Sequence, residues 1–256
     1  MVSTEIIGQK LIVPTTLFVE LTELLKKLNA EQMTIINSKL YVPANVVTVY
    51  ADLSSVIQKL GKETTENVNT LSVAIPGYAD LSVFAATEEP VIEVTLLDED
   101  TIEFYAKPVK VTQRLGFFDE DIYREEMQQM LSTETLFRYT INEAFYKIYS
   151  KLATTGVQVI LTPNAANIYK HKTDVISVES ISLSVIKPDK TDDKTVINVP
   201  ENLIKLKPNS IDVRKLDDET YMYVLTIPIQ GLNVYVFSLT DSKPVATNQI
   251  EELLQD

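Results

Sequence analysis

Apolar and polar residues alternate over many short stretches of this chain, a pattern that predicts a protein built mainly of β-strands. One stretch differs, because the apolar residues of Leu17–Leu28 recur every three or four positions, as in an amphipathic helix. Pro14 ends the strand Lys10–Val13 in front of this helix, and the hydroxyl of Thr15 or Thr16 is expected to cap it.

Alternation predicts the remaining strands, and helical spacing predicts further helices. The helices are expected at Tyr78–Thr87, Glu120–Leu131 and Asn142–Leu152, with a short one at Ser55–Leu60. The strands are expected at Met33–Ile36, Lys39–Val42, Val46–Leu53, Val91–Leu97, Ile102–Ala106, Val109–Thr112, Arg138–Ile141, Val157–Leu161, Ala166–Tyr169, Ile176–Ile186, Ser210–Leu216, Tyr221–Ile227 and Gly231–Leu239.

The order of these elements occurs twice, which predicts an internal duplication. Leu71–Tyr105 contains a strand that ends in proline, a short helical segment, a strand, an acidic turn and a further strand, and Val196–Ile227 repeats this order. Thr16–Phe18 and Thr135–Phe137 add a second echo, since each leads into a long helix and then a strand. A period of this length indicates duplicated domains rather than a solenoid, whose repeats are shorter.

The segment Gly116–Glu134 differs in composition from both halves, because it is acidic and poor in β-forming residues. We expect it to connect two domains, to be partly helical and to pack most of its apolar side chains on the protein, with some left open for a partner. The chain is therefore predicted to contain a first domain at residues 1–115, a connector at 116–134, a second domain at 135–240 and a tail at 241–256.

The composition offers little catalytic chemistry. The chain has no Cys and one His, so the usual zinc sites cannot be built, and His171 is expected to be a solvated side chain between two lysines. Asp98–Asp100 lacks the ligand spacing of an EF-hand, and no glycine-rich phosphate loop or GxSxG nucleophile motif is present. We therefore predict a protein that is not an enzyme and holds no metal and no cofactor.

The net charge of −13 argues, taken alone, against nucleic acid as a partner. Its distribution changes this picture, because Lys147 and Lys151 lie four residues apart on one face of a predicted helix. Such a protein can repel duplex DNA over most of its surface and accept it at one face. No apolar stretch approaches the ~18–20 residues of a membrane helix and no signal peptide is visible, so we expect no membrane partner and a cytoplasmic protein.

The repeated order of strands and helices resembles that of the DNA sliding clamps, the processivity factors of DNA polymerases, and most closely the two-domain bacteriophage type. The likeness rests on Thr15–Leu28, Leu71–Tyr105 and Leu136–Leu239, which together cover most of the chain. It implies an α+β fold of two tandem DNA-clamp-like domains, with antiparallel sheets outside and two helices per domain inside. The connector is longer and more helical than a simple linker, which departs from the family pattern.

The same resemblance implies partners. A homotrimer would close into a ring that encircles double-stranded DNA without reading its sequence, and sheet edges of neighbouring subunits would pair. A DNA polymerase and a clamp loader would bind the ring, in the host cytoplasm if the protein is viral.

Two functional surfaces follow from the resemblance. The DNA-facing lining would consist of Lys26, Lys27, Lys147, Lys151, Lys205 and Lys207. A pocket for a partner peptide beside the connector would be lined by Leu40, Tyr41, Val46, Phe117, Phe118, Pro244 and Val245. Each lysine could instead be an ordinary exposed side chain, and each pocket residue an ordinary buried one. Glu20 and Glu23 beside the first two lysines make that helix less basic than a clamp would lead us to expect.

Two other classes of function stay open. A β-rich structural protein of a virion or other assembly would share the acidity, the absence of Cys and the tendency to oligomerise, but would not need lysines on inner helices. An enzyme or small-molecule binder is the third class, and no feature of the sequence favours it.

Overall fold

The computed structural model describes residues 6–44, 46–60, 65–152, 156–170, 174–179, 181–187 and 193–254. The chain divides into two compact units, and each is described by itself. Unit 1 comprises Met1–Leu131 with Ile229–Val234, and unit 2 comprises Ser132–Pro228 with Tyr235–Asp256. The domain limits expected from the sequence stay a prediction, and His171 lies outside the described residues.

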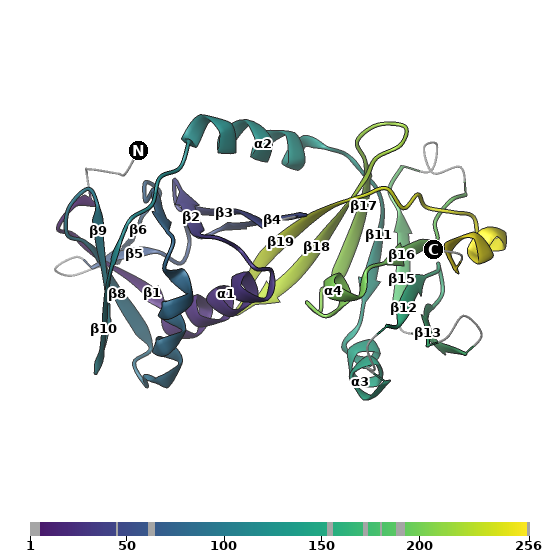
Figure 1. Ribbon diagram of the computed structural model, residues 1–256, viewed down its shortest axis with the longest axis horizontal. Helices are drawn as coiled ribbons and strands as arrows, with labels where there is room; N and C mark the ends of the chain where they lie inside the picture. The colour runs from purple at the N-terminus through teal and green to yellow at the C-terminus, as the bar shows by residue number, and fades with distance from the viewer. Residues whose placement is uncertain are drawn as a thin grey trace. The chain divides into compact units, whose positions relative to one another are not determined.

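The described part of unit 1 contains short strands and three helical segments (Figure 1). The strands are β1 (Lys10–Pro14), β2 (Met33–Ile36), β3 (Lys39–Ala44), β4 (Val47–Asp52), β5 (Gln58–Leu60), β6 (Thr65–Asn67), β7 (Val73–Ile75), β8 (Val91–Leu96), β9 (Thr101–Ala106) and β10 (Val109–Arg114). The helices are α1 (Thr15–Lys27), the 3-10 helix η2 (Tyr78–Ala86) and α2 (Glu120–Ser132).

The strands of unit 1 form two antiparallel layers. One sheet has the order β10-β9-β8-β1-β5-β6, and the other layer has the order β4-β3-β2-β7. Val94 and Phe104 of the first sheet and Met33 and Val73 of the second line one small internal space, together with side chains of α1. The core of unit 1 therefore lies between the two layers.

Helix α1 buries the apolar stripe that its sequence predicts. Leu17, Phe18, Leu21, Leu24 and Leu25 are each at most 6% exposed. Burial of side chains of this size stabilises a protein by roughly 1.5–3 kcal/mol each. The stripe therefore fixes α1 on the core and leaves its other face to polar residues.

The predicted N-cap of α1 is wrong. Pro14 holds the N-cap position and makes no side-chain cap hydrogen bond, while Thr15 is already helical. The Thr15 hydroxyl instead donates to the carbonyl oxygen of Glu89 at 2.7 Å. It is thus engaged in tying the start of the helix to the segment before β8, and not in capping.

Unit 2 has a similar set of elements. The strands are β11 (Thr135–Ile141), β12 (Gln158–Leu161), β13 (Ala166–Tyr169), β14 (Val175–Val178), β15 (Ile181–Val185), β16 (Ile197–Val199), β17 (Ser210–Lys215), β18 (Tyr221–Ile229) and β19 (Leu232–Thr240). The helices are α3 (Glu143–Leu152), the single-turn α4 (Glu201–Ile204) and the 3-10 helix η4 (Thr247–Leu254).

The pairing of the strands confirms the duplication. In unit 1, β1 lies between β5 and β8, and β2 lies between β3 and β7. In unit 2, β11 lies between β15 and β17, and β12 lies between β13 and β16. A helix follows the first strand of each unit, and Pro76 and Pro200 stand just before η2 and α4. Both units therefore share one topology.

Two predicted elements are wrong. Ser55–Leu60 is not a helix, because its last three residues form β5 and pair with β1. Ile176–Ile186 is not one strand, because β14 pairs with β13 whereas β15 pairs with β11. The two strands belong to different layers of unit 2, so the chain must leave one sheet before it enters the other.

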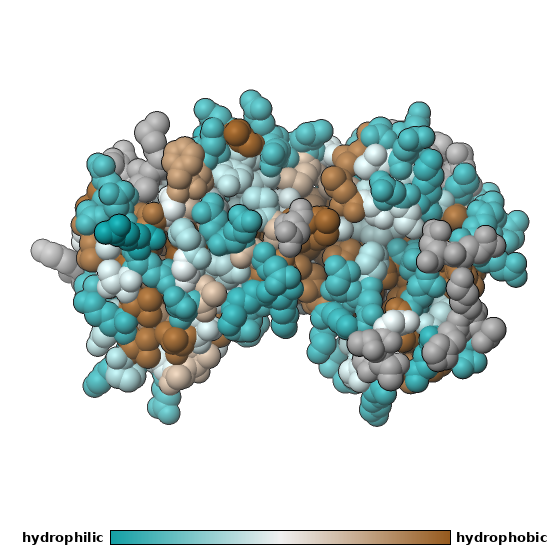
Figure 2. Space-filling model, viewed as in Figure 1, coloured by the Kyte–Doolittle hydropathy of each residue, from teal (hydrophilic) through white to brown (hydrophobic). Residues whose placement is uncertain are grey.

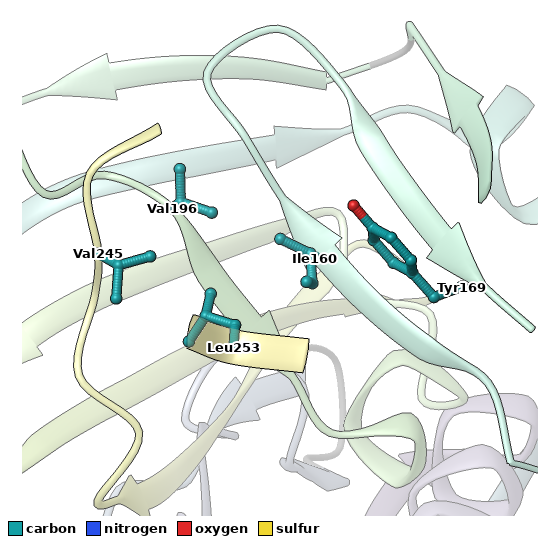
Figure 3. Packing of buried hydrophobic residues seen from close by; sticks show 5 residues of the cluster. All are labelled: Ile160, Tyr169, Val196, Val245 and Leu253. Atoms are coloured by element: carbon teal, nitrogen blue, oxygen red, sulfur yellow. The ribbon is translucent and has the colours of Figure 1, made fainter. Parts of the chain in front are cut away.

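The C-terminal segment packs on unit 2 (Figure 3). Val245 pairs with Val196 through two backbone hydrogen bonds of 2.9 Å, and Leu253 of η4 lies over Ile160 of β12 in the same apolar cluster. The side chain of Gln158 donates to the carbonyl oxygen of Leu253 at 3.0 Å. The predicted tail is therefore part of the packed structure of this unit.

The face seen in Figure 2 is mainly hydrophilic, with smaller apolar patches between the polar ones. Within the described residues, no helix combines the length and the apolar character that crossing a membrane requires.

The buried stripe of α1 leads to a first prediction. Leu25→Ala should lower the free energy of unfolding by about 2–5 kcal/mol, because Leu25 is fully buried and its loss leaves a cavity. Chemical denaturation followed by circular dichroism measures the change. Lys27→Ala on the exposed face of the same helix is the control, and an equal loss there would contradict the orientation of α1.

Candidate functional site

The first two candidate DNA-facing lysines lie at the C-terminal end of α1. Lys26 contacts Glu23 at 3.2 Å and the hydroxyl of Ser82 on η2 at 3.4 Å. Lys27 is exposed and forms no ion pair with a described residue. Positive charge at this end of a helix is favoured by the helix dipole, so both positions are explained by α1 itself as well as by a ligand.

Helix α3 carries the second pair on its exposed face. Lys147 contacts Glu143 at 3.2 Å, with both side chains largely exposed, and Lys151 extends from the last turn. Phe145 and Tyr149 stack on the opposite face, with ring centroids 5.6 Å apart. The apolar face therefore directs the two lysines away from the core of unit 2.

The third pair flanks the end of α4. Lys205 contacts Glu201 at 2.6 Å, and its hydrogen bond lowers the pKa of that carboxyl, with help from the backbone N–H of Gly156. Lys207 follows with a φ of 58°, so the chain turns sharply there. The Tyr146 hydroxyl of α3 donates to the carbonyl oxygen of Pro208, which joins this turn to α3. Lys147, Lys151, Lys205 and Lys207 thus lie on elements that contact one another.

Nearby carboxylates reduce the positive charge around three of these lysines. Lys26, Lys147 and Lys205 each pair with a Glu three or four residues earlier on the same helix. Exposed pairs of this kind contribute about 0–1 kcal/mol and exchange readily with solvent or a new anion. The surfaces therefore suit weak, exchangeable phosphate contacts and not a tight, sequence-reading interface.

The second candidate surface lies where α2 runs beside β2 and β3 of unit 1 (Figure 1). Tyr41 of β3 donates a hydrogen bond of 2.7 Å to the carboxylate of Glu126, and its ring meets that of Tyr123 edge-on at 5.0 Å. Burial and the bond to Glu126 raise the pKa of Tyr41, so its hydroxyl stays a donor. Phe118 packs with Ile36 in a small apolar cluster at the start of the connector.

A cavity of about 200 Å³ remains beneath the helix. It is lined by Ile36, Asn37, Lys39, Tyr41, Tyr123, Arg124, Met127 and Gln128. Among these only Tyr41 was predicted from the sequence. The residues of α2 were missed because their contacts with β2 and β3 join positions more than 80 residues apart.

The other predicted pocket residues are distributed differently. Leu40 is fully buried in the core of unit 1, on the face of β3 opposite to Tyr41. Val46 and Phe117 are 71% and 87% exposed, so neither lines the cavity. Pro244 and Val245 are buried within unit 2, where Val245 packs in the cluster of Figure 3. The described residues include no group of three His, Asp or Glu side chains placed to hold a metal ion.

No protein-family model matches the chain, and no curated protein sequence matches it. The arrangement of two α+β units with antiparallel sheets and few helices is nevertheless the fold of the two-domain DNA sliding clamps, as a comparison with solved structures shows.

One similar structure is the proliferating cellular nuclear antigen of Entamoeba histolytica, with a TM-score of 0.57 and 10% identity over 91% of this chain and 99% of that one. Another is the DNA polymerase sliding clamp of Bacillus subtilis, with a TM-score of 0.56 and 14% identity over 94% of this chain and 65% of that one. This chain thus spans about two thirds of the bacterial clamp. A third is the A. fulgidus PCNA bound to the C-terminal region of FEN-1, with a TM-score of 0.51 and 14% identity over 90% and 97% of the two chains.

The link between α3 and the turn after α4 leads to a second prediction. Tyr146→Phe should lower the free energy of unfolding by about 1–3 kcal/mol, because the Pro208 carbonyl loses its donor. Burial raises the pKa of Tyr146 in the fold, whereas tyrosine ionises near pH ~10 in the unfolded chain. Stability should therefore fall as the pH rises past about 10, and less steeply in the variant.

Urea unfolding between pH 7 and 11 measures both effects. Tyr105→Phe is the control, because Tyr105 is 39% exposed on β9 and lies in the other unit. An identical slope in wild type and Tyr146→Phe would contradict the assigned burial of this hydroxyl.

Proposed function

We propose that this chain is a DNA sliding clamp, a non-catalytic protein whose three copies close a ring around duplex DNA and tether a DNA polymerase to it. The observation that carries the proposal is the pair of equivalent helices in each unit, α1 with η2 and α3 with α4, in a fold shared with known clamps. The proposed site of action is the cytoplasm, including that of a bacterial host if the protein belongs to the bacteriophage type.

Encirclement explains how an acidic chain can hold DNA. A closed ring retains its ligand by topology, so phosphate contacts need only be weak and unspecific. Lys27, Lys151 and Lys207 supply positive charge without an ion pair to a described residue, and Lys26, Lys147 and Lys205 can exchange their own carboxylates for phosphate. The acidic remainder repels DNA from the other faces.

Ring closure requires complementary edges on each copy. In the described sheets, β10 pairs only with β9, and β14 pairs only with β13. In an antiparallel pair, the backbone N–H groups of one strand point alternately toward the partner strand and away from it. The N–H of Leu115 donates to the carbonyl oxygen of Asp100, so it points toward β9. The N–H groups of Lys110, Thr112 and Arg114 therefore point away from β9. An exposed edge of this kind is a template for a strand of another copy.

The edge of β14 matches this pattern. The hydrogen bond from Lys170 to Asp174 leaves the amides of Val175 and Ser177 pointing away from β13. We propose that Ser177 of one copy pairs antiparallel with Thr112 of the next copy. In this register the exposed residues of both strands lie on one face, and Glu179 lies opposite Lys110. This charge complementarity supports a head-to-tail contact, which closes with three copies of two units each.

Polymerase and clamp-loader peptides are proposed to bind at α2, beside Tyr41 and Phe118. Support comes from the cavity at this connector and from the PCNA neighbour that is bound to the C-terminal region of FEN-1. Among the described residues, no feature favours the alternative of a structural assembly protein.

The proposed ring leads to a third prediction. Light scattering over a concentration series should give three times the 28.8 kDa mass of the subunit. Thr112→Pro should shift the chain toward the monomer, because proline removes an amide that points to the next copy while the bonds of β10 to β9 remain. Thr101→Ala at the start of β9 is the control, because it leaves the edge of β10 intact and should stay trimeric.

A stable wild-type dimer would contradict the ring of six units. A trimer that Thr112→Pro leaves unchanged would place the contact on another edge.

The proposed lining leads to a fourth prediction. Lys147→Glu with Lys151→Glu should shorten retention on circular DNA by about tenfold or more, because two attractive contacts with phosphate become repulsive. The oligomeric mass should not change. The measurement is the lifetime of clamp loaded on nicked plasmid, followed by gel filtration at two salt concentrations.

The matched control is Lys194→Glu with Lys243→Glu, which changes the net charge equally at exposed positions away from α3. Equal losses in both variants would mean that total charge governs retention, and full retention in the α3 variant would remove α3 from the lining.

A further inference from the structure

Helix α2 buries little of its surface against unit 1. None of its residues is buried, although it is 13 residues long. Its inward stripe consists only of half-buried side chains at Glu120, Tyr123, Met127 and Met130. Because the stability of a docked segment follows the apolar surface that it buries, α2 should open at a much lower free energy than the sheets beneath it.

The contacts of the connector are unevenly spread. At its start, the backbone N–H of Gly116 donates to Ala74 at 2.8 Å, and Phe118 is only 4% exposed. A Cβ at Gly116 would lie 2.8 Å from Pro76, so only glycine permits this close approach. The start of the connector is therefore a firm anchor from which the helix extends.

Beyond this anchor, Tyr41 holds the middle of α2. Its hydroxyl bonds to Glu126 and its ring meets Tyr123, while Asn37 donates to Glu120 at 3.2 Å. The cavity of about 200 Å³ beneath these contacts is large enough to hold water, so the helix covers the surface without sealing it.

We propose that α2 is a latch that occupies the partner-peptide site of its own chain, with Tyr123 as the internal ligand of Tyr41. A partner segment binds by lifting α2 and placing an aromatic side chain of its own against Tyr41. This inference rests on the proposed function, because it concerns the regulation of the peptide site assigned to the connector.

Charge selects the kind of segment that can replace Tyr123. From Asp119 to Glu126 the connector carries five carboxylates, at Asp119, Glu120, Asp121, Glu125 and Glu126, and one cation, Arg124. The surface over α2 is mainly hydrophilic in Figure 2, with a smaller apolar patch among the polar residues. The complementary partner is therefore a peptide with an aromatic anchor flanked by Lys or Arg, which the acidic helix attracts and holds at its rim.

The latch lowers the apparent affinity for such a peptide. If only a fraction of the molecules is open, the apparent dissociation constant is the intrinsic one divided by that fraction. Variants that weaken the latch but keep the ring of Tyr41 should therefore bind the peptide more tightly. If α2 were instead a fixed wall of the site, the same variants would bind it more weakly.

The first experiment measures opening without a ligand. Tyr41→Phe should speed amide hydrogen exchange of residues 120–131 by about three- to tenfold, because the bond to Glu126 is lost while the ring remains. Tyr105→Phe on β9 is the matched control and should leave this exchange unchanged. Unchanged exchange in Tyr41→Phe would overturn the latch.

The second experiment measures occupancy in the full chain. The probe is a fluorescent synthetic decapeptide with two adjacent phenylalanines flanked by lysines, and its partner probe has alanines in place of the phenylalanines. Tyr123→Ala should tighten binding of the phenylalanine probe by about three- to tenfold, because one competing aromatic pair is lost. The alanine probe should not bind to this variant. Ile122→Ala, the adjacent and 54% exposed residue of α2, should bind like wild type.

Each outcome decides the proposal. Weaker binding of the phenylalanine probe to Tyr123→Ala would mean that Tyr123 contacts the bound peptide, and it would overturn the latch. Equal binding to wild type and Tyr123→Ala would also overturn the latch. Absence of binding in every variant overturns the aromatic peptide as the occupant. Trimer mass and retention on DNA, measured in the same variants, report on the clamp function independently, so a failed latch is distinguished from a failed clamp.

Discussion

The structure depends on the double pairing of the first strand in each unit. β1 and β11 each have a neighbour on both sides, so the chain that leaves them can only turn onto one face of its sheet. The helix that follows must cover that face, and its apolar stripe is buried as a result. The polar side of the helix, with its lysines, is then directed outward by the same constraint, which couples the core of each unit to its candidate ligand surface.

Much of this architecture was visible in the sequence because it is local. The stripe of α1 and the proline before η2 and α4 are read from neighbouring residues, and all of them hold in the structure. β5 and β14 were missed or merged because strands of three and four residues carry too little alternation, and their partners lie in distant segments. The Thr15 hydroxyl shows the same limit, since its acceptor at Glu89 is 74 residues away.

The candidate sites divide along the same line. The six candidate lysines are all exposed, but their role in facing DNA stays a prediction. Three of them pair with carboxylates, so the surfaces around them carry less positive charge than counting lysines suggests. The sequence predicted only Tyr41 among the residues that line the cavity beneath α2. In the sequence, Tyr123 and Glu126 look like ordinary residues of an acidic helix. Their role depends on where tertiary structure places that helix, and amphipathic spacing contains no information on this point.

The packing of the C-terminal segment has a consequence for the synthesis of the protein on the ribosome. Val196, Ile160 and Gln158 are synthesised long before Val245 and Leu253 emerge to cover them. Until then an apolar sheet of unit 2 is exposed to other nascent chains and to the chaperones that survey them. Residues translated well after the sheet itself are therefore the ones that cover it, and a chain stalled between the sheet and these residues would be a substrate for quality control.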